Sequence, residues 1–190
     1  MKKTILEARV FVSEYPSAHE RTVKDYEIDI ECTDNRSYTY NGQTYKLKCG
    51  DVIIKAPGAV VSSIGDQKSY ILTLDFSQRE HSTVYSRNIA GELQPLSDNE
   101  LITSLPCVFH PRNPHLLFEI YEKLVQTPLL SSKEAELLVD EIIYTLNADI
   151  AHKAYLQTKR TTDATHKVID YMEKNLAKNT IKIIFITSDG

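Results

Sequence analysis

The chain has 190 residues, a formal net charge of −4 and an isoelectric point near 5.9. Its length allows a well-formed core, either in one domain with an appendage or in two small domains. The acidic balance argues against strong nucleic-acid binding by this chain alone, because DNA-binding domains carry a basic face. With three widely spaced cysteines and no apolar run of membrane-spanning length, we expect a soluble protein of the reducing cytoplasm.

Residues 26–32 alternate apolar and acidic side chains, in the order YEIDIEC. This period of two predicts an antiparallel strand with one buried and one solvated face. We expect the carboxylates of Asp25, Glu27, Asp29 and Glu31 to face water rather than to form an acid–base site.

A tight hairpin is predicted around Asn41-Gly42, because both residues accept the positive φ angles of a type I′ turn. A two-residue loop pairs Tyr40 with Gln43 and brings Tyr38 opposite Tyr45. The aromatic pair is expected to fix the register of the two strands.

Further turns precede three short strands with strong β propensity. The turns are Gly50-Asp51, Pro57-Gly58 and Gly65-Asp66, and the strands are VIIKA, AVVSSI and SYILTLDF. Short strands joined by tight turns at this spacing indicate a sandwich or a barrel.

After Pro106 the apolar residues recur at helical spacing. Asn113-Pro114 predicts the start of one helix, and the capping box of Ser131 and Glu134 predicts the start of a longer helix that extends to about Leu156. A polar linker, a third helix and a β-branched strand or tail are expected to follow, at residues 157–163, 163–177 and 181–186.

The sequence lacks the common motifs of catalytic and metal sites. The sequence contains no phosphate-binding glycine loop, no H-E-x-x-H and no G-x-S-x-G. His110 and His115 flank a proline-rich connection and are not expected to bind a metal. We therefore predict neither catalysis nor a metal or other cofactor.

The order of these elements resembles the N-terminal domain of AraC-family transcription regulators. Residues 38–63 resemble the second half of its cupin barrel, with residues 21–32 and 69–77 as flanking strands. Residues 113–155 resemble the helix pair that dimerises many members, and residues 166–176 resemble the first helix of the DNA-binding domain.

The resemblance implies an α+β fold, namely a cupin-like antiparallel β-barrel (jelly roll) followed by two to three α-helices. Residues 1–110 are expected to form the barrel, with an N-terminal arm of residues 1–20 over its pocket. Residues 111–157 are expected to form a helical dimerisation segment, and residues 158–190 a linker and the truncated start of a helix-turn-helix domain.

Two departures from the family pattern shape the expected function. Metal-binding cupins carry histidines on the opening strand and after the Pro-Gly turn, whereas residues 26–32 lack histidine and Val61 stands at the later position. Only fourteen residues follow Leu176, without a helix-turn-helix pattern, so this chain is not expected to read DNA alone.

The resemblance implies an effector-sensing and dimerisation domain that binds a small polar metabolite, with a sugar as the expectation. A cupin enzyme and a barrel used only for protein interaction remain alternatives. The predicted ligand-binding residues are Arg21, Tyr26, Tyr38, Val61, Ser63 and Thr73. The predicted homodimer interface comprises Leu138, Val139, Ile142, Ile143, Leu146 and Ile150.

Overall fold

The computed structural model describes residues 3–14, 19–77, 93–96, 107–128 and 132–187, with the backbone alone for residues 160–164 and 172–187. The chain divides into two compact units, Met1–Asn147 and Ala148–Gly190. Nine strands and two helices occur in the described residues. The strands are β1 (Thr4–Ser13), β2 (Arg21–Thr22), β3 (Tyr26–Glu31), β4 (Ser37–Tyr40), β5 (Gln43–Lys46), β6 (Val52–Lys55), β7 (Val60–Ile64), β8 (Gln67–Asp75) and β9 (Val108–Phe109), and the helices are α2 (Pro114–Gln126) and α3 (Lys133–Thr187).

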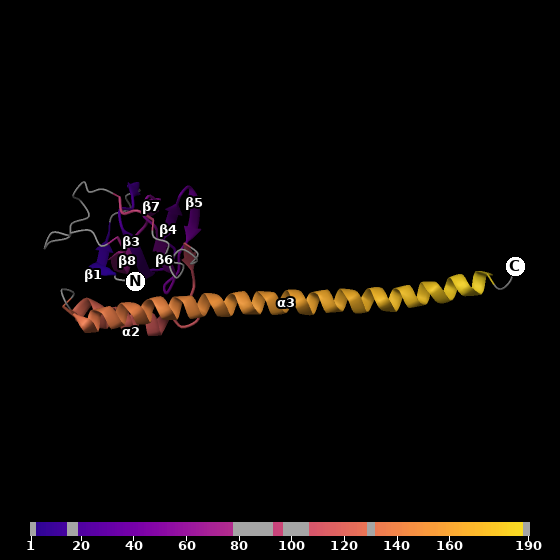
Figure 1. The fold of residues 1–190 in the computed structure, drawn as a ribbon. Coiled ribbons are helices and arrows are strands. Elements are labelled where there is room, and N and C mark those ends of the chain that lie inside the picture. The colour runs from indigo at the N-terminus through magenta and orange to yellow at the C-terminus, as the bar shows by residue number, and fades with distance from the viewer. Residues whose placement is uncertain (1–2, 15–18, 78–92, 97–106, 129–131, 188–190) are drawn as a thin grey trace. The chain divides into compact units, whose positions relative to one another are not determined.

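The strands form two antiparallel sheets, with the order β1-β8-β3-β6-β9 in one and β2-β7-β4-β5 in the other (Figure 1). The pairs β1·β8, β2·β7, β3·β6 and β4·β5 are nested one inside the next. Such nesting arises when one long antiparallel ribbon of eight strands folds over itself, which is a jelly roll. The predicted α+β class and jelly roll are therefore confirmed.

The predicted hairpin is present with the predicted register. Asn41 and Gly42 have φ angles of 46° and 83°, as a type I′ turn requires, and Tyr38 pairs with Tyr45. The Asn41 side chain also accepts a hydrogen bond of 2.8 Å from the Val60 amide. The turn is thus held to the neighbouring strand β7.

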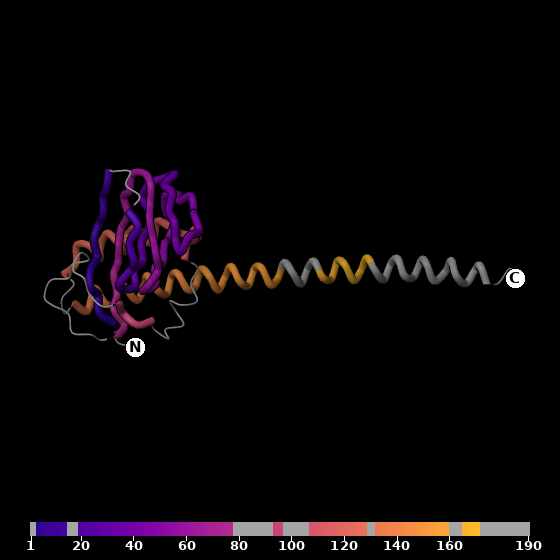
Figure 2. Tube along the Cα trace, turned by 90° about the horizontal axis from the view of Figure 1, so that it is seen from above, coloured from indigo at the N-terminus to yellow at the C-terminus, as the bar shows by residue number. Residues whose placement is uncertain are grey.

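Helix α2 covers the outer face of the five-stranded sheet, and in both views it lies beside that sheet (Figures 1 and 2). As predicted, Pro114 occupies its first turn and Asn113 accepts a hydrogen bond from the Leu116 amide. The Tyr121 hydroxyl donates to the Ile28 carbonyl at 2.7 Å, and the Tyr121 ring contacts that of Tyr70. These contacts fix α2 to β3 and β8.

The solvated acidic face predicted for β3 is wrong, because all six residues of this strand are buried. Tyr26, Ile28 and Ile30 lie on the face that α2 covers. The alternate residues point to the second sheet, where Glu27 lines an internal cavity together with residues of β4 and β7. The alternating pattern predicts one solvated face for this strand, whereas other elements cover both faces of the sheet.

The predicted N-terminal arm is largely a strand. Residues 4–13 form β1 at the edge of the five-stranded sheet, and they pair with β8 from Thr4 opposite Asp75 to Ser13 opposite Gln67. Pairing with β8 gives the backbone of this segment hydrogen-bond partners, and alternate side chains face the interior of the jelly roll. A loose arm would have neither.

The start of α3 differs from the predicted capping box by one residue. Ser131 lies outside the described residues, and Ser132 instead accepts a hydrogen bond from the Ala135 amide at 3.2 Å. Within the first unit, Lys3 pairs with Asp140 and so joins the N-terminal strand region to α3.

The backbone of α3 continues through the segments predicted as a linker and a strand. Residues 157–163 and 181–186 are both helical. No glycine or proline occurs between Lys133 and Thr187, so nothing in this stretch interrupts the helical hydrogen bonds. No helix in the described part of the chain is long and apolar enough to cross a membrane.

Candidate ligand-binding site

A cavity of about 370 Å³ lies between the two sheets of the jelly roll. The five-stranded sheet contributes its floor, which includes Phe11 and Ile71, and the four-stranded sheet contributes Val61 and Ser63 opposite. Basic side chains are the largest polar group in its wall: Arg9, Arg21, Lys24, Arg36 and Lys55. A volume of this size suits a small molecule.

One end of the cavity is built on an ion-pair cluster around Glu27. Arg21 donates two hydrogen bonds to its carboxylate, at 3.0 and 2.6 Å, and the Lys55 ammonium donates a third at 3.0 Å. Lys55 also pairs with the fully buried Asp29. Burial alone would lower the pKa of Arg21, but its hydrogen bonds and charge interaction with Glu27 raise that pKa above its ordinary value.

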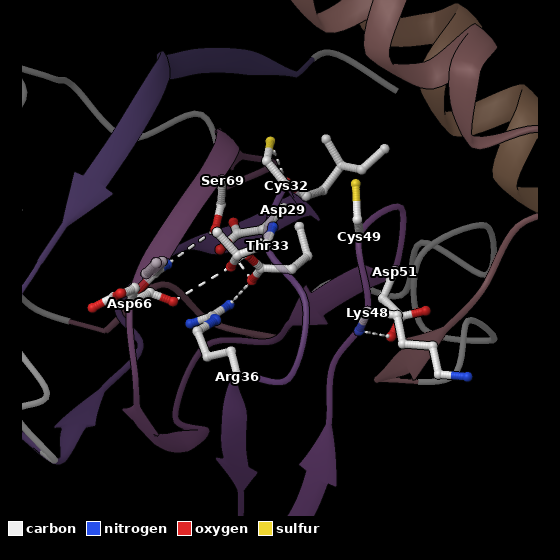
Figure 3. Close-up of polar contacts among 12 residues, drawn as sticks. Asp29, Cys32, Thr33, Arg36, Lys48, Cys49, Asp51, Asp66 and Ser69 are labelled. Atoms are coloured by element: carbon white, nitrogen blue, oxygen red, sulfur yellow. Dashed lines mark hydrogen bonds and ion pairs between the residues drawn. The ribbon is translucent and has the colours of Figure 1, made fainter.

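A second ion pair forms at Glu31, the last residue of β3, whose partner Arg36 lines the cavity. Arg36 pairs with this carboxylate, and the Thr33 amide donates to it at 3.1 Å. Figure 3 shows the Arg36 guanidinium directed toward the group that includes Thr33 and Ser69. The same guanidinium lies 5.6 Å from the centre of the Tyr38 ring, which is within cation–π range.

Tyr38 lies between these two ion-pair clusters and lines the cavity. Its hydroxyl is buried and has no hydrogen-bond partner in the described part of the chain, and the same is true of one Asp29 carboxylate oxygen. Burial, followed by the charges of Asp29 and Glu27, raises the pKa of the Tyr38 phenol well above its ordinary value. The hydroxyl therefore stays protonated at neutral pH.

Four of the six predicted ligand-binding residues line this cavity: Arg21, Tyr38, Val61 and Ser63. The other two are not among its lining residues. Tyr26 lies on the opposite face of β3, where its ring packs edge-on against Phe76 at 5.4 Å. Thr73 is fully buried two residues beyond the lining residue Ile71, so the structure places it on the interior face. Binding by any of the six stays a prediction.

The sequence reasoning missed Arg9, Arg36, Lys55 and the interior position of Glu27. A usable signal exists for one pair, since Glu27 lies directly opposite Lys55 in the ladder between β3 and β6. Opposite charges at facing positions stabilise an antiparallel pair. This signal identifies the ion pair only once β3 is known to pair with β6, and the sequence alone does not show that pairing.

A polar contact away from the cavity joins the jelly roll to the connection before α2. His110 Nδ1 lies 2.8 Å from an Asp51 carboxylate oxygen. Within the described ranges, no group of three or more histidine, cysteine or acidic side chains is placed to hold a metal ion.

Comparisons with known proteins leave the family open. No protein-family model matches the sequence, and no curated protein matches it. Among solved structures, ToxT from Vibrio cholerae is similar with a TM-score of 0.40 and 9% sequence identity. The match covers 74% of this chain and 57% of the ToxT chain, so the chain spans less than two thirds of that relative. A likeness at this level assigns neither a family nor a function.

The six residues predicted for a dimer interface all lie on α3. Four are buried within this one chain and two are half-buried: Val139, Ile142, Ile143 and Leu146, then Leu138 and Ile150. The buried four complete the core of the first unit and offer no surface to a partner. Large apolar side chains that α3 does expose in this unit are Leu137 and Tyr144, with exposed fractions of 58% and 77%.

Proposed function

We propose that the chain is the effector-sensing and dimerisation part of an AraC-type transcription regulator. The observation that carries the proposal is the cavity between the sheets, which is open to a small molecule and walled by polar side chains. Its volume of about 370 Å³ lies near the lower end of the range for ligand sites, so we propose a small polar metabolite, with a sugar among the first candidates.

The wall combines aromatic rings with fixed polar groups. Phe11 and Tyr38 place aromatic rings in the wall, and the ion pairs of Arg21 and Arg36 hold their guanidinium groups in place. Rings that stack on apolar faces, together with oriented donors, suit a polyhydroxylated ligand. Side chains already held in position lose little entropy on binding, which favours affinity.

Regulation by a ligand requires that two arrangements of the protein differ in affinity for it. Arg9 and Phe11 bring the edge strand β1 to the cavity, and Lys3 just before that strand pairs with Asp140 of α3. We propose that ligand contact with β1 is the link between the cavity and α3. Control of DNA binding by a separate helix-turn-helix domain, a cytoplasmic location and the absence of catalysis belong to the same proposal.

Dimerisation is proposed through the exposed side of α3 in the first unit. Leu137 and Tyr144 lie seven residues apart, which is two helical turns, so both lie on the side of α3 that we propose to face a second copy of the chain. The exposed carboxylates of Asp140 and Glu141 lie between them on that side. Light scattering of the wild type and of the variant Leu137→Glu/Tyr144→Glu tests this. We expect the wild type to be a dimer and the variant to be a monomer. A monomeric wild type would contradict the proposed interface.

The sensing role is tested by a thermal-shift screen against sugars and other polar metabolites, followed by calorimetry of any hit. A ligand at about 100 times its Kd adds roughly 2.7 kcal/mol, which raises Tm by roughly 5–10 °C at this size. The variant Ser63→Leu narrows the cavity and should abolish the shift, whereas Gln43→Leu on the exposed hairpin should not.

Mass spectrometry of the recovered ligand separates a sensor from an enzyme. A sensor returns the ligand unchanged after long incubation, whereas an enzyme converts it. A broad panel with no shift in Tm would contradict the sensing role and favour a barrel used only for protein interaction.

A further inference from the structure

The charges that a solute meets in the cavity are mostly positive. Its wall contains five lysine and arginine side chains but a single carboxylate, that of Glu27. The acidic partners Glu7, Asp29 and Glu31 are not among the lining residues, so the wall presents the basic member of these pairs.

The members of these ion pairs differ in exposure. The Arg21 side chain is 41% exposed and its partner Glu27 is 2% exposed. Arg9 is 36% exposed against 25% for its partner Glu7. A molecule entering the cavity therefore meets the Arg21 guanidinium rather than the Glu27 carboxylate, which is covered and already accepts three hydrogen bonds. The Glu7 carboxylate is only partly covered, so the contrast at Arg9 is smaller.

Lys24 adds a positive charge that these pairs do not neutralise. It is half-buried in the cavity wall, and its ammonium has no ion-pair partner within the described ranges. Of the five basic side chains in the wall, the other four each pair with a carboxylate among the described residues.

We infer that the ligand is a small organic monoanion whose carboxylate binds Arg9 and Arg21, with Lys24 supplying the balancing charge. Arginine suits this task because its planar N–H groups match the two oxygens of a carboxylate. The two arginines come from different sheets, β1 and β2, so one carboxylate would join the two layers. The inference rests on the proposed sensing role and names its ligand class.

The test uses pairs of compounds that differ in one carboxylate, measured on the full chain by thermal shift and calorimetry. Suitable pairs are glucuronate with glucose, galacturonate with galactose, and lactate with 1,2-propanediol. We expect the acid of at least one pair to bind about tenfold or more tightly than its neutral partner. We also expect its affinity to fall as salt is added, because the mouth of the site is exposed.

Two variants locate the binding charge without leaving a deeply buried carboxylate unpaired. Lys24→Gln and Arg9→Gln should each weaken acid binding about tenfold. Lys68→Gln is the matched control, because Lys68 is exposed and alternates with the lining residue Gln67 on β8, so it should bind the acid as the wild type does.

The outcomes separate this inference from the proposed function. Equal or tighter binding of the neutral partners would overturn the anion assignment and leave the sensing role standing. Acid binding that Lys24→Gln, Arg9→Gln and Lys68→Gln leave unchanged would also overturn it, because the acid would then bind elsewhere. If no member of any pair binds at millimolar concentration, and no compound of the metabolite screen does, both proposals fail.

Discussion

The two faces of strand β3 show how the same strand can serve packing on one side and a polar site on the other. The face toward α2 carries Tyr26, Ile28 and Ile30 and is an ordinary apolar core. The opposite face carries three buried carboxylates, each paired with a basic side chain from another part of the jelly roll. Buried ion pairs are a poor way to gain stability compared with apolar packing. Their presence beside a cavity is the reason that we propose a binding role for that face.

The largest effect is expected at the charged face, from Lys55→Met. This change leaves Asp29 and one side of Glu27 buried without their cation, which costs about 3–5 kcal/mol. Urea denaturation measures it, with the exposed Lys46→Met as the control. A loss below about 1 kcal/mol would show that water reaches this cluster and that the pairs are not truly buried.

The apolar face is expected to respond by a different mechanism. Ile28→Ala removes methyl groups that pack under α2 and leaves a cavity, so it should cost about 2–4 kcal/mol in the same urea experiment. Its cost should hardly depend on salt, because no charge is involved. A strong salt dependence for Ile28→Ala would contradict the separation between the two faces.

Two buried tyrosine hydroxyls, one near each face of β3, allow the two faces to be compared by removal of a single oxygen atom. The Tyr121 hydroxyl bonds to the Ile28 carbonyl, so Tyr121→Phe should cost about 1–2 kcal/mol. The Tyr38 hydroxyl has no partner in the described part of the chain, so Tyr38→Phe should leave stability unchanged or raise it by about 1 kcal/mol. Thermal unfolding of both variants decides this, and an equal loss in both would mean that the Tyr38 hydroxyl is bonded after all.

The smallest effect concerns the thiol that follows Glu31. Burial, with a further contribution from the Glu31 carboxylate, raises the pKa of Cys32 to about 11. Because the thiolate is the reactive form, Cys32 should be alkylated at about pH 8 roughly a hundredfold more slowly than a free cysteine. Mass spectrometry of iodoacetamide-treated protein measures the rate, with an unstructured cysteine-containing peptide in the same mixture as the reference. Equal rates at Cys32 and at the peptide thiol would mean that the Cys32 side chain is not buried as the structure places it.

Features set by neighbouring residues were predictable from the sequence. The type I′ turn at Asn41-Gly42 and the Asn113 cap with Pro114 each depend on backbone preferences within a few residues. The jelly roll followed from the order of its turns and strands through a family resemblance. Among the predicted site residues, Val61 and Ser63 share a face by alternation along β7, and both line the cavity.

Features set by distant elements were not predictable. The acidic residues of β3 look solvated until both covering layers are known, and Lys55 becomes their partner only through the register of β3 with β6. The stripe on α3 was assigned to a second copy because the sequence does not show that Val139 and Ile142 complete the core of their own unit. Polar residues near Gln157 looked like a linker, although none of them stops a helix.

The location of a bound ligand tests the central claim most directly. We would record amide shifts in a ¹H–¹⁵N NMR spectrum while titrating whichever compound the matched pairs identify. Shifts centred on the cavity wall, at Arg9, Arg21, Val61 and Ser63, are the predicted result. Shifts confined to α2 or α3, with the cavity wall unchanged, would contradict the account, because the charged face of β3 would then have no ligand to serve.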